Sequence, residues 1–298
     1  MPSYSQYKRF LSVLDVDDVE WITVKGNHIP IKKGENKEEA IKSFFENKSS
    51  ERGQKSPEIK QSVSKGSVSP EKAKNPSVKK WRYPAVDFSK KGAEEKFIEE
   101  TYPRVKKVLS KAYFEEPDIT NDLKSIKGIK FHGLDHRRKS KSSAVGKINR
   151  ERIENPDKQD VSDRTIMSKM YDLVRYTQVV DKDNFVEQAQ KTIDTLKKKG
   201  YKVVQLKNFW LPEVNKGGAY RGINMKWMSP KGQKFEYQFN TENNIEIKDV
   251  KMHKLYEERR NLDPNKESDR AKIEKLDKEM AEVAKGFDNP KGIEKLKK

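Results

Sequence analysis

Between residues 170 and 239 the chain changes regularly between the hydrophobic periods of strand and helix. The stretch YDLVRYTQVV, which ends at Val180, is rich in β-branched and aromatic residues and predicts a buried strand. Residues 183–199 place apolar side chains on one helical face, and Gly200 ends that helix. Further strands are predicted at 201–210, 220–228 and 235–239. This order predicts an α/β (α+β) fold with a mixed β-sheet flanked by helices.

The chain before this region predicts a small N-terminal module followed by a linker. Residues 20–31 have the alternation and the Gly-Asn turn of a β-hairpin, and a short amphipathic helix follows, so residues 1–46 form the module. Residues 47–80 almost lack large apolar side chains and cannot offset the entropy cost of ordering. We therefore expect a disordered linker there.

Residues 81–262 are expected to form the main domain. Helical spacing covers residues 94–113, where Pro103 predicts a break into two shorter helices. A second helix is predicted at residues 244–261. A charged helix with a narrow apolar stripe is predicted at about 268–285, so residues 263–298 form a charged C-terminal helical arm.

Composition limits the classes of function. The formal net charge is +18, which favours polyanionic partners such as nucleotides, RNA, DNA or an anionic membrane, although a solvated lysine-rich surface explains it equally well. The absence of cysteine excludes disulfides, thiolate metal sites and a cysteine nucleophile. No apolar run is long enough for a membrane span, and the N-terminal residues do not resemble a signal peptide, so a cytoplasmic location is expected.

A basic stretch, HRRKSKSSAVGKINRER, offers cationic side chains in place of a glycine-rich phosphate loop. Arg137 and Lys139 fall on one face of an extended segment, and Lys147 follows Ser143 by about one helical turn. A guanidinium fork, mobile ammonium groups and a hydroxyl donor suit a triphosphate. A solvated segment or an RNA contact explains the same charges.

Two carboxylates are candidate ligands of Mg²⁺. Asp172 lies at the start of the buried strand. An ionised carboxylate there is costly unless it binds a cation or caps a turn. In FEYQFNT, alternation places Glu236, Gln238 and Asn240 on one face of a strand. That face is either exposed to water or is a site in which Glu236 holds the metal or acts as a general base.

The segment AYRGIN supplies an aromatic ring with polar neighbours. Tyr220 is placed to stack on a base, while Arg221 and Asn224 are placed to contact that base or a phosphate. Alternatively, Tyr220 is simply an aromatic residue of the sheet core.

These motifs together resemble the RelA/SpoT-like (p)ppGpp synthetases. Arg137, Lys139, Ser143 and Lys147 match the family's RxK…S…K pattern, and YDLVRYTQVV is similar to its Asp-Leu-Val strand. AYRGIN resembles the family's Gly-Tyr-x-Ser-x-His segment, and EYQFNT resembles its Glu-x-Gln-x-x-Thr strand. The four motifs occur in the family's order between about residues 132 and 260, which is under half of the chain.

The resemblance implies a pyrophosphokinase with Mg²⁺ as cofactor. Arg137, Lys139 and Lys147, supported by Ser143, would bind ATP phosphates, and Asp172 and Glu236 would serve the metal and catalysis. Tyr220, with Arg221, Asn224 and Gln238, would bind a nucleotide acceptor. Pyrophosphate would move from ATP to the acceptor's ribose 3′-oxygen, a reaction that depends on positioning and charge neutralisation.

The sequence also departs from the family's pattern. Arg175 and Thr177 stand where the family has glycine and arginine, and Asn224 replaces its histidine, so GDP, GTP, an adenine nucleotide or a tRNA 3′ end remain as acceptors. The chain has no His-Asp pair of the family's hydrolase domain. MHKLYEERR resembles toxin-type variants, which implies a toxin-type effector with an immunity partner.

The segment EWITVKGNHIPI resembles phage minor head proteins. It supports an alternative function: a basic, virion-associated head or ejected protein that binds DNA through its phosphates. A tRNA 3′-end pyrophosphokinase is a further alternative, with basic residues holding the RNA backbone.

Overall fold

The structure is a computed structural model that describes residues 19–24, 27–50, 82–263 and 266–296. The described chain divides into two compact units. The first holds the described residues up to Lys107 together with Val145–Met167, and the second holds Val108–Ala144 and the described residues from Ser168 onward. Two helices, α3 (Ala93–Lys124) and α4 (Lys141–Glu154), contribute residues to both units.

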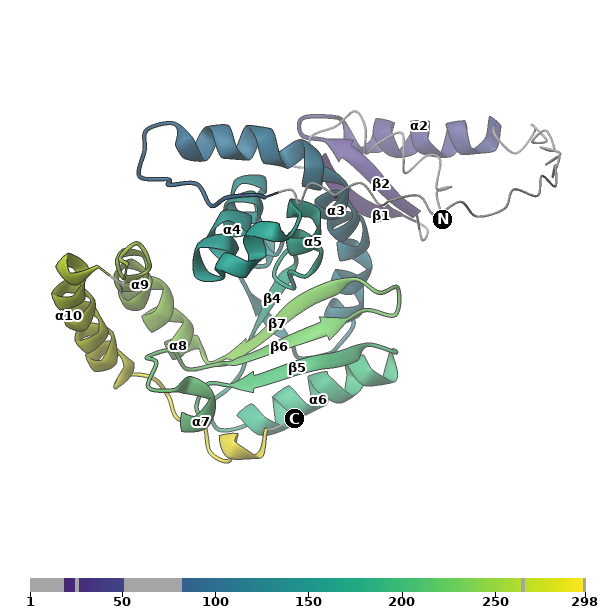
Figure 1. Cartoon of the computed structure of the whole chain (residues 1–298). Coiled ribbons are helices and arrows are strands. Elements are labelled where there is room, and N and C mark those ends of the chain that lie inside the picture. Colours follow the sequence, from purple (N-terminus) through teal and green to yellow (C-terminus); the bar gives the residue numbers. More distant parts are fainter. Residues whose placement is uncertain (1–18, 25–26, 51–81, 264–265, 297–298) are drawn as a thin grey trace, which may run out of the picture. The chain divides into compact units, whose positions relative to one another are not determined.

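The first unit contains the predicted N-terminal hairpin. Strand β1 (Val19–Val24) pairs antiparallel with β2 (Asn27–Lys32), and helix α2 (Lys37–Ser50) follows (Figure 1). Helix α2 continues into the first residues of the predicted linker, and residues 51–81 lie outside the described residues. The limits of the predicted N-terminal module and linker stay predictions.

Helix α3 is one helix, so the predicted break at Pro103 is wrong. Proline in a helix interior removes one backbone hydrogen bond and costs about 3 kcal/mol. On both sides of Pro103, Thr101 and Val105 are fully buried, and this packing offsets the local cost.

Buried charges join the remaining helices of the first unit. Helix α5 (Asp163–Ser168) begins at Asp163, whose side chain is 1% exposed and accepts hydrogen bonds from Arg152 and Arg104, both at 2.6 Å. The Arg152 guanidinium also lies 5.1 Å from the centre of the Tyr83 ring. A carboxylate this deeply buried is tolerated because two cations neutralise it.

The second unit is built on a five-stranded mixed sheet with the order β3-β4-β7-β6-β5 (Figure 1). Its strands are β3 (Lys130–His132), β4 (Arg175–Val179), β5 (Lys202–Asn208), β6 (Ile223–Met228) and β7 (Lys234–Asn240). Only β4 and β7 pair in parallel among these described strands. The predicted mixed sheet flanked by helices is thereby confirmed.

One face of this sheet forms the core. Trp227, Phe235, Tyr237 and Phe239 are fully buried on it. Helix α6 (Phe185–Lys198) packs there, where Thr192 Oγ1 donates to Gln178 Oε1 at 3.0 Å (Figure 1). The second half of α3 packs there too, with Thr120 Oγ1 2.8 Å from the Tyr176 hydroxyl. The alternation of the strands therefore leaves their polar residues on the opposite face.

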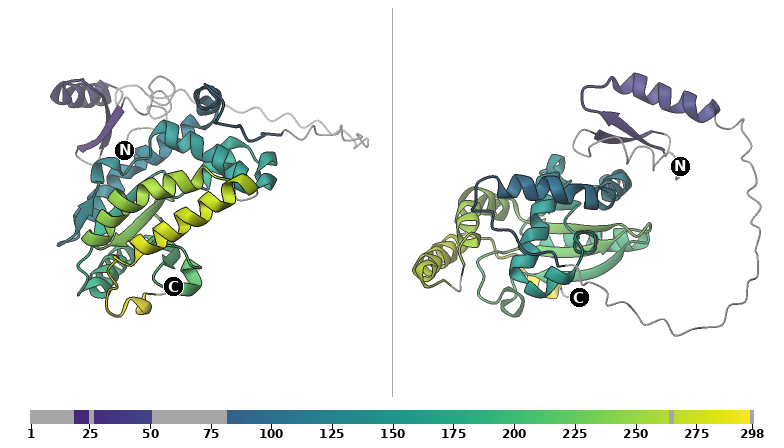
Figure 2. Two further views of the ribbon diagram at one scale, coloured as in Figure 1. Left: turned by 90° about the vertical axis from the view of Figure 1, so that its left-hand side faces the viewer. Right: turned by 45° about the horizontal axis from the view of Figure 1, so that its top comes forward.

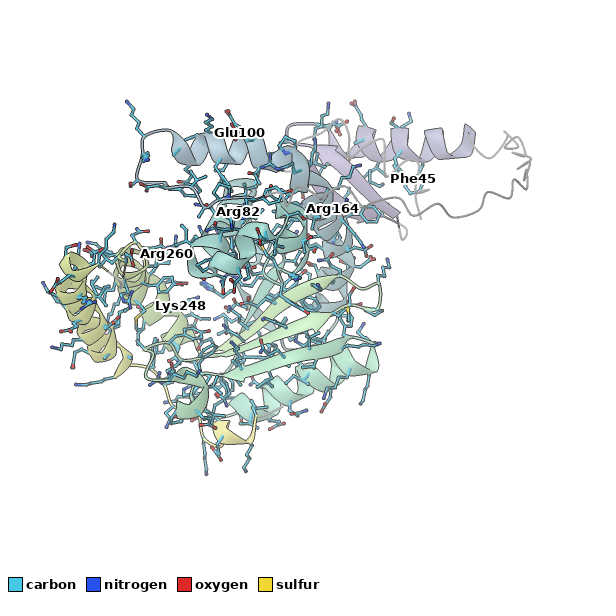
Figure 3. All side chains as sticks on the ribbon, viewed as in Figure 1. Phe45, Arg82, Glu100, Arg164, Lys248 and Arg260 are labelled. Atoms are coloured by element: carbon cyan, nitrogen blue, oxygen red, sulfur yellow. The ribbon has the colours of Figure 1, made fainter. Side chains whose placement is uncertain are left out.

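The predicted helix at 244–261 is broken by a π-helical turn, Ile247–Met252, between α8 (Glu242–Glu246) and α9 (His253–Arg260). Helix α10 (Glu267–Ala284) runs beside α9 (Figure 2), joined by Arg259–Asp277 at 2.9 Å and Lys272–Glu258 at 2.8 Å. Figure 3 labels Lys248, in the π-helical turn, and Arg260, the last residue of α9.

The sequence did not predict several short elements: strand β3, helix α7 (Pro212–Asn215) and the 3-10 helices Leu134–His136, Pro156–Asp160 and Ile293–Lys295. Each is five residues or fewer, too short to give a hydrophobic period. Within the described ranges, no helix combines the length and the apolar character needed to cross a membrane.

Candidate active site on the polar face of the sheet

Glu236 lies at the centre of the polar face, on strand β7. In register it faces Arg175 of β4 on one side and Lys226 of β6 on the other. Neighbouring strands are about 4.8 Å apart, so both cations belong to the immediate surroundings of the carboxylate. The pairing of three strands therefore places an acid between two cations that neighbouring strands carry.

Hydrogen bonds fix the Glu236 side chain. Gln238 Nε2 donates to a carboxylate oxygen of Glu236, and Gln238 Oε1 accepts from Thr177 Oγ1 at 3.3 Å. Gln238 is 9% exposed, so these hydrogen bonds between Thr177, Gln238 and Glu236 are largely shielded from water. The structure thus gives Gln238 a partner in Glu236, whereas the sequence predicted an acceptor contact for it.

The basic stretch lies beside the start of β4. Lys139 N donates to Leu173 O at 3.0 Å, and Arg175 N donates to Arg137 O at 2.8 Å, around a bridge between Arg138 and Val174. On the other side, Glu236 N donates to Val174 O at 3.0 Å. Three of the sequence motifs are therefore carried by adjacent extended segments of one sheet.

Asp172 lies in a turn before β4, because that strand begins at Arg175 and not at residue 170 as predicted. Its carboxylate Oδ2 is 2.9 Å from Lys139 Nζ, and the two side chains are 10% and 19% exposed. The proposed metal ligand and the proposed phosphate ligand thus bind one another in this structure. Each neutralises the other where burial would make a single charge costly.

Arg137 is tied to a buried acid that sequence analysis missed. Arg137 Nε donates to Glu116 Oε1 at 2.6 Å, and the Glu116 side chain is fully buried on α3. Burial by itself lowers the pKa of Arg137, but the hydrogen bond and the charge of Glu116 outweigh it and raise that pKa. The guanidinium is therefore permanently charged and held in one orientation.

Glu116 is itself held by neutral partners. Its carboxylate accepts from Thr120 Oγ1 on the same helix, and the Tyr176 hydroxyl of β4 lies 3.4 Å from the same oxygen. Burial and the charge of Glu116 raise the pKa of Tyr176 well above its ordinary value. Nothing in the spacing of the sequence indicates this network, because its members come from α3, β4 and the basic stretch.

Tyr220 is packed against the polar face. Its hydroxyl donates to Asn224 Oδ1 at 2.9 Å, and its ring meets Phe209 edge-on with centroids 5.2 Å apart. Burial and the nearby Glu236 charge raise the pKa of Tyr220. A Cβ at Gly222 would lie 2.3 Å from the Tyr220 hydroxyl, so any larger residue there would displace that ring. Tyr220 is therefore held in place by Asn224 and Phe209 in this structure.

The other predicted ligands have different surroundings. Arg221 donates to the carbonyls of Gly218 at 2.9 Å and Tyr220 at 3.0 Å, and burial lowers its pKa. Ser143 is exposed in the first turn of α4. Lys147 lies one turn later in that helix, within the first unit. All the predicted ligands except Lys147 therefore belong to the second unit.

The oxygen donors on this face suit a hard cation. No cluster of three or more histidine or acidic side chains forms a metal cage within the part of the chain that the structure describes. Mg²⁺ in phosphoryl-transfer sites is held by one or two carboxylates together with substrate phosphates, and it keeps several waters. Asp172 and Glu236, carried by adjacent segments, fit that donor set.

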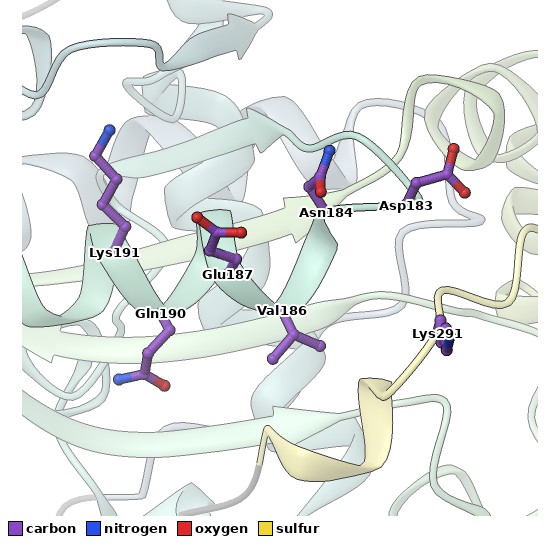
Figure 4. A pocket seen from close by; sticks show the side chains of 7 residues that line it. All are labelled: Asp183, Asn184, Val186, Glu187, Gln190, Lys191 and Lys291. Carbon is purple, nitrogen blue, oxygen red and sulfur yellow. The ribbon is translucent and has the colours of Figure 1, made fainter.

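A separate hollow of about 570 Å³ lies at the first turns of α6 (Figure 4). Its charges are mixed, with Asp183 and Glu187 beside Lys191 and Lys291. None of the predicted ligands lines it. Because its charges balance, it lacks the cation excess of the polar sheet face.

No protein-family model and no curated protein matches the sequence. Similar solved structures include the type VI effector Tas1 in complex with its immunity protein, at 23% identity and a TM-score of 0.37, covering 60% of this chain and 96% of that chain. The product-bound small alarmone synthetase 1 of Bacillus subtilis is also similar, at 15% identity and a TM-score of 0.32, covering 64% and 92%.

A GTP pyrophosphokinase family protein from Streptococcus pneumoniae is similar at 14% identity and a TM-score of 0.33, covering 64% of this chain and 89% of that chain.

Proposed function

We propose that the polar sheet face of the second unit is the active site of a RelA/SpoT-like pyrophosphokinase. The observation that carries the proposal is that the basic stretch lies beside the start of β4, that Asp172 lies in the turn leading into β4, and that Glu236 lies on β7, which pairs with β4. The four motifs supply carboxylates, guanidinium groups and ammonium groups to these neighbouring segments. That set of groups matches what the transfer of a charged phosphoryl group requires.

Each residue has a role in this proposal. Arg137, held by Glu116, and Lys139 bind ATP phosphates, with Ser143 as a further donor from the first turn of α4. The phosphate contact of Lys147, which lies in the first unit, stays a prediction. Glu236 takes the proton from the acceptor's ribose 3′-hydroxyl. The 3′-oxygen then forms a bond to the β-phosphorus of ATP, the bond between that phosphorus and the oxygen it shares with the α-phosphate breaks, and AMP leaves.

Asp172 and Glu236 would hold Mg²⁺, which neutralises charge on the ATP phosphates when bound. In this structure Lys139 Nζ donates a hydrogen bond to Asp172 Oδ2 at 2.9 Å. Nucleotide binding therefore exchanges partners: Lys139 moves from a carboxylate to a phosphate, and Asp172 becomes available to the cation. The exchange conserves charge pairing, so neither group is left buried and uncompensated.

The acceptor side is formed by Tyr220, Arg221, Asn224 and Gln238. Turning Tyr220 outward breaks its hydrogen bond to Asn224 and frees the ring to stack on a base. We propose a nucleotide acceptor, either a guanine or an adenine nucleotide. Since the chain contains no hydrolase motif, we also propose a toxin-type effector that an immunity protein restrains, because unopposed synthesis would consume ATP.

The test is to incubate the purified chain with γ-labelled ATP, Mg²⁺ and, separately, AMP, ADP, GDP, GTP and deacylated tRNA. The proposal expects label on a free nucleotide. It expects loss of that transfer in Asp172→Asn and retention in Glu187→Gln, an exposed carboxylate on α6. Label on tRNA alone would favour the tRNA enzyme, and no transfer together with salt-sensitive DNA binding would favour the DNA-binding protein.

A further inference from the structure

The last described residues of the chain leave α10 and return to the sheet. Helix α10 ends at Ala284, and residues 286–296, which we call the C-terminal strap, run back beside α6 (Figure 1, yellow). Asn208, the buried last residue of β5, donates through Nδ2 to Ile293 O at 2.8 Å and to Leu296 O at 3.2 Å. Ile293 and Leu296 are themselves buried. The strap is therefore packed against the end of β5.

Asp288 is the residue through which the strap binds the end of β7. Its carboxylate Oδ2 accepts from Thr241 Oγ1 at 2.6 Å, and its backbone N donates to Asn244 Oδ1 at 2.6 Å. Thr241 and Asn244 are both buried, and Thr241 Oγ1 also accepts from Asn244 N at 3.2 Å, which caps α8. The threonine that ends the motif EYQFNT, which begins at Glu236, therefore holds Asp288 in place.

Asp288 also binds the loop that carries Tyr220. Residues 209–222 join β5 to β6, and we call them the acceptor loop. Trp210 Nε1 donates to Asp288 O at 2.9 Å, and the Trp210 ring meets Phe185 of α6 edge-on with centroids 5.3 Å apart. Asp288 thus contacts the end of β7 through its side chain and the acceptor loop through its backbone carbonyl.

Contacts inside the acceptor loop connect its start to Tyr220. Asn215 Nδ2 donates to Phe209 O at 2.9 Å and to Tyr220 O at 3.1 Å. The rings of Phe209 and Tyr220 meet with centroids 5.2 Å apart, and Phe209 N donates to Gly222 O at 2.9 Å. Because these contacts tie the two ends of the loop together, holding Trp210 also limits where the backbone of Tyr220 can lie.

We propose that Asp288 is a positioning residue, which joins the end of β7 to the acceptor loop and so fixes the separation between Glu236 and Tyr220. The inference rests on the proposed function, in which Glu236 takes a proton from the acceptor's ribose and Tyr220 contacts its base. The base and the ribose are joined covalently, so the two residues must be held at a matching separation. A surface loop opens easily by itself, whereas hydrogen bonds to buried partners restrict it.

Amide hydrogen exchange of the full chain tests this link without catalysis. Asp288→Ala removes the carboxylate that Thr241 binds, and Trp210→Phe removes the indole donor but keeps an aromatic ring. Each should speed exchange of the amides of residues 211–218 by about fivefold, the factor for one ordinary hydrogen bond, and leave β4 and β7 unchanged. Asp288→Asn, which still offers Thr241 an oxygen, should match wild type. Asp194→Ala, which removes an α6 carboxylate bonded within its own helix at 2.8 Å, is the matched control.

Steady-state transfer tests whether the link positions the acceptor. Asp288→Ala and Trp210→Phe should each raise KM for the acceptor by about fivefold and leave KM for ATP unchanged, and Asp288→Asn should keep the wild-type value. Unchanged loop exchange, or faster exchange over the whole sheet, would overturn the link. A loosened loop with an unchanged KM for the acceptor, or with equal rises in both KM values, would overturn the positioning role. Absence of transfer in the wild-type chain would overturn the proposed function, while the exchange rates would still decide whether Asp288 holds the loop.

Discussion

The two groups of cations in the second unit differ in what holds them. Arg137 and Lys139 are bonded to carboxylates at 2.6 and 2.9 Å, and these carboxylates are buried or nearly so. Lys226 and Lys234 instead lie against the Tyr171 ring at 5.4 and 5.5 Å. The first group is oriented before any ligand arrives, whereas the second is held by weaker contacts to a ring and a carbonyl.

This difference separates two ways of preparing a site for phosphate. Paired cations cost little to keep in the folded protein, but a ligand must displace their carboxylates. Cations without such partners cost stability, and a ligand gains that free energy back when it binds. Five expected outcomes test the comparison, beginning with the carboxylate that lies between the two groups.

Glu236→Gln should lower the rate of pyrophosphate transfer by about 10³-fold, because general-base catalysis contributes 10²–10⁴-fold and the metal loses a ligand as well. This corresponds to about 4 kcal/mol of barrier. Rapid-quench measurement with labelled ATP gives the rate, and Glu187→Gln on α6 serves as control. A rate within about threefold of wild type would remove Glu236 from the mechanism.

Glu116→Gln should destabilise the fold by about 3 kcal/mol, because it leaves the largely buried Arg137 without its carboxylate. It should also raise KM for ATP more than KM for the acceptor, since the guanidinium loses its fixed orientation. Urea denaturation and steady-state kinetics provide the two readouts. Equal rises in both KM values would indicate a general structural defect.

Lys139→Met should destabilise the fold by about 2 kcal/mol, because Asp172 is only 10% exposed and loses its cation. Adding Asp172→Asn to Lys139→Met should restore much of that loss, since both charges are then absent. A double-mutant cycle in urea measures the coupling. Additive effects of the two substitutions would contradict the ion pair.

Gly222→Ala should cost about 1–2 kcal/mol, because the new Cβ would meet the Tyr220 hydroxyl at 2.3 Å and displace the ring. Tyr220→Ala in the same chain should remove most of this cost, which thermal denaturation of the two single variants and the double variant would detect. If the packed ring keeps acceptors out, Gly222→Ala should also lower KM for the acceptor.

Lys234→Gln should leave the folded state as stable as wild type or stabilise it by about 0.5 kcal/mol, because it relieves repulsion between neighbouring cations. Lys139→Met, in the group of cations paired with carboxylates, is expected to change the stability of the fold in the opposite direction. Urea denaturation at low ionic strength, where screening is weakest, gives the clearest contrast. A loss above about 1 kcal/mol would show that the contacts of Lys234 with the Tyr171 ring and Ser168 contribute to the stability of the fold.

The sequence predicted α6 and every described strand except β3, because their apolar residues follow the periods of helix and strand. It also placed Asp172 and Glu236 at the sheet. It failed where long-range packing decides the outcome. Burial of Thr101 and Val105 keeps α3 continuous through Pro103, and no local signal indicates the π-helical turn.

The parts of the site that were missed depend on register. Lys226 and Arg175 flank Glu236 only because β7 lies between β4 and β6. Glu116 reaches Arg137 only because α3 packs beneath β4. Spacing within one motif cannot reveal contacts between strands that are adjacent in space and distant in sequence.

The most direct test of the central claim uses two labels on ATP. With a nucleoside diphosphate and Mg²⁺, the polar-face mechanism predicts that a γ-label moves to the acceptor, while an α-label appears in AMP at the same rate. Both transfers should be absent in Glu236→Gln and present in Glu187→Gln. Release of the γ-label as free phosphate, or transfer that persists in Glu236→Gln, would contradict a pyrophosphokinase site on this face.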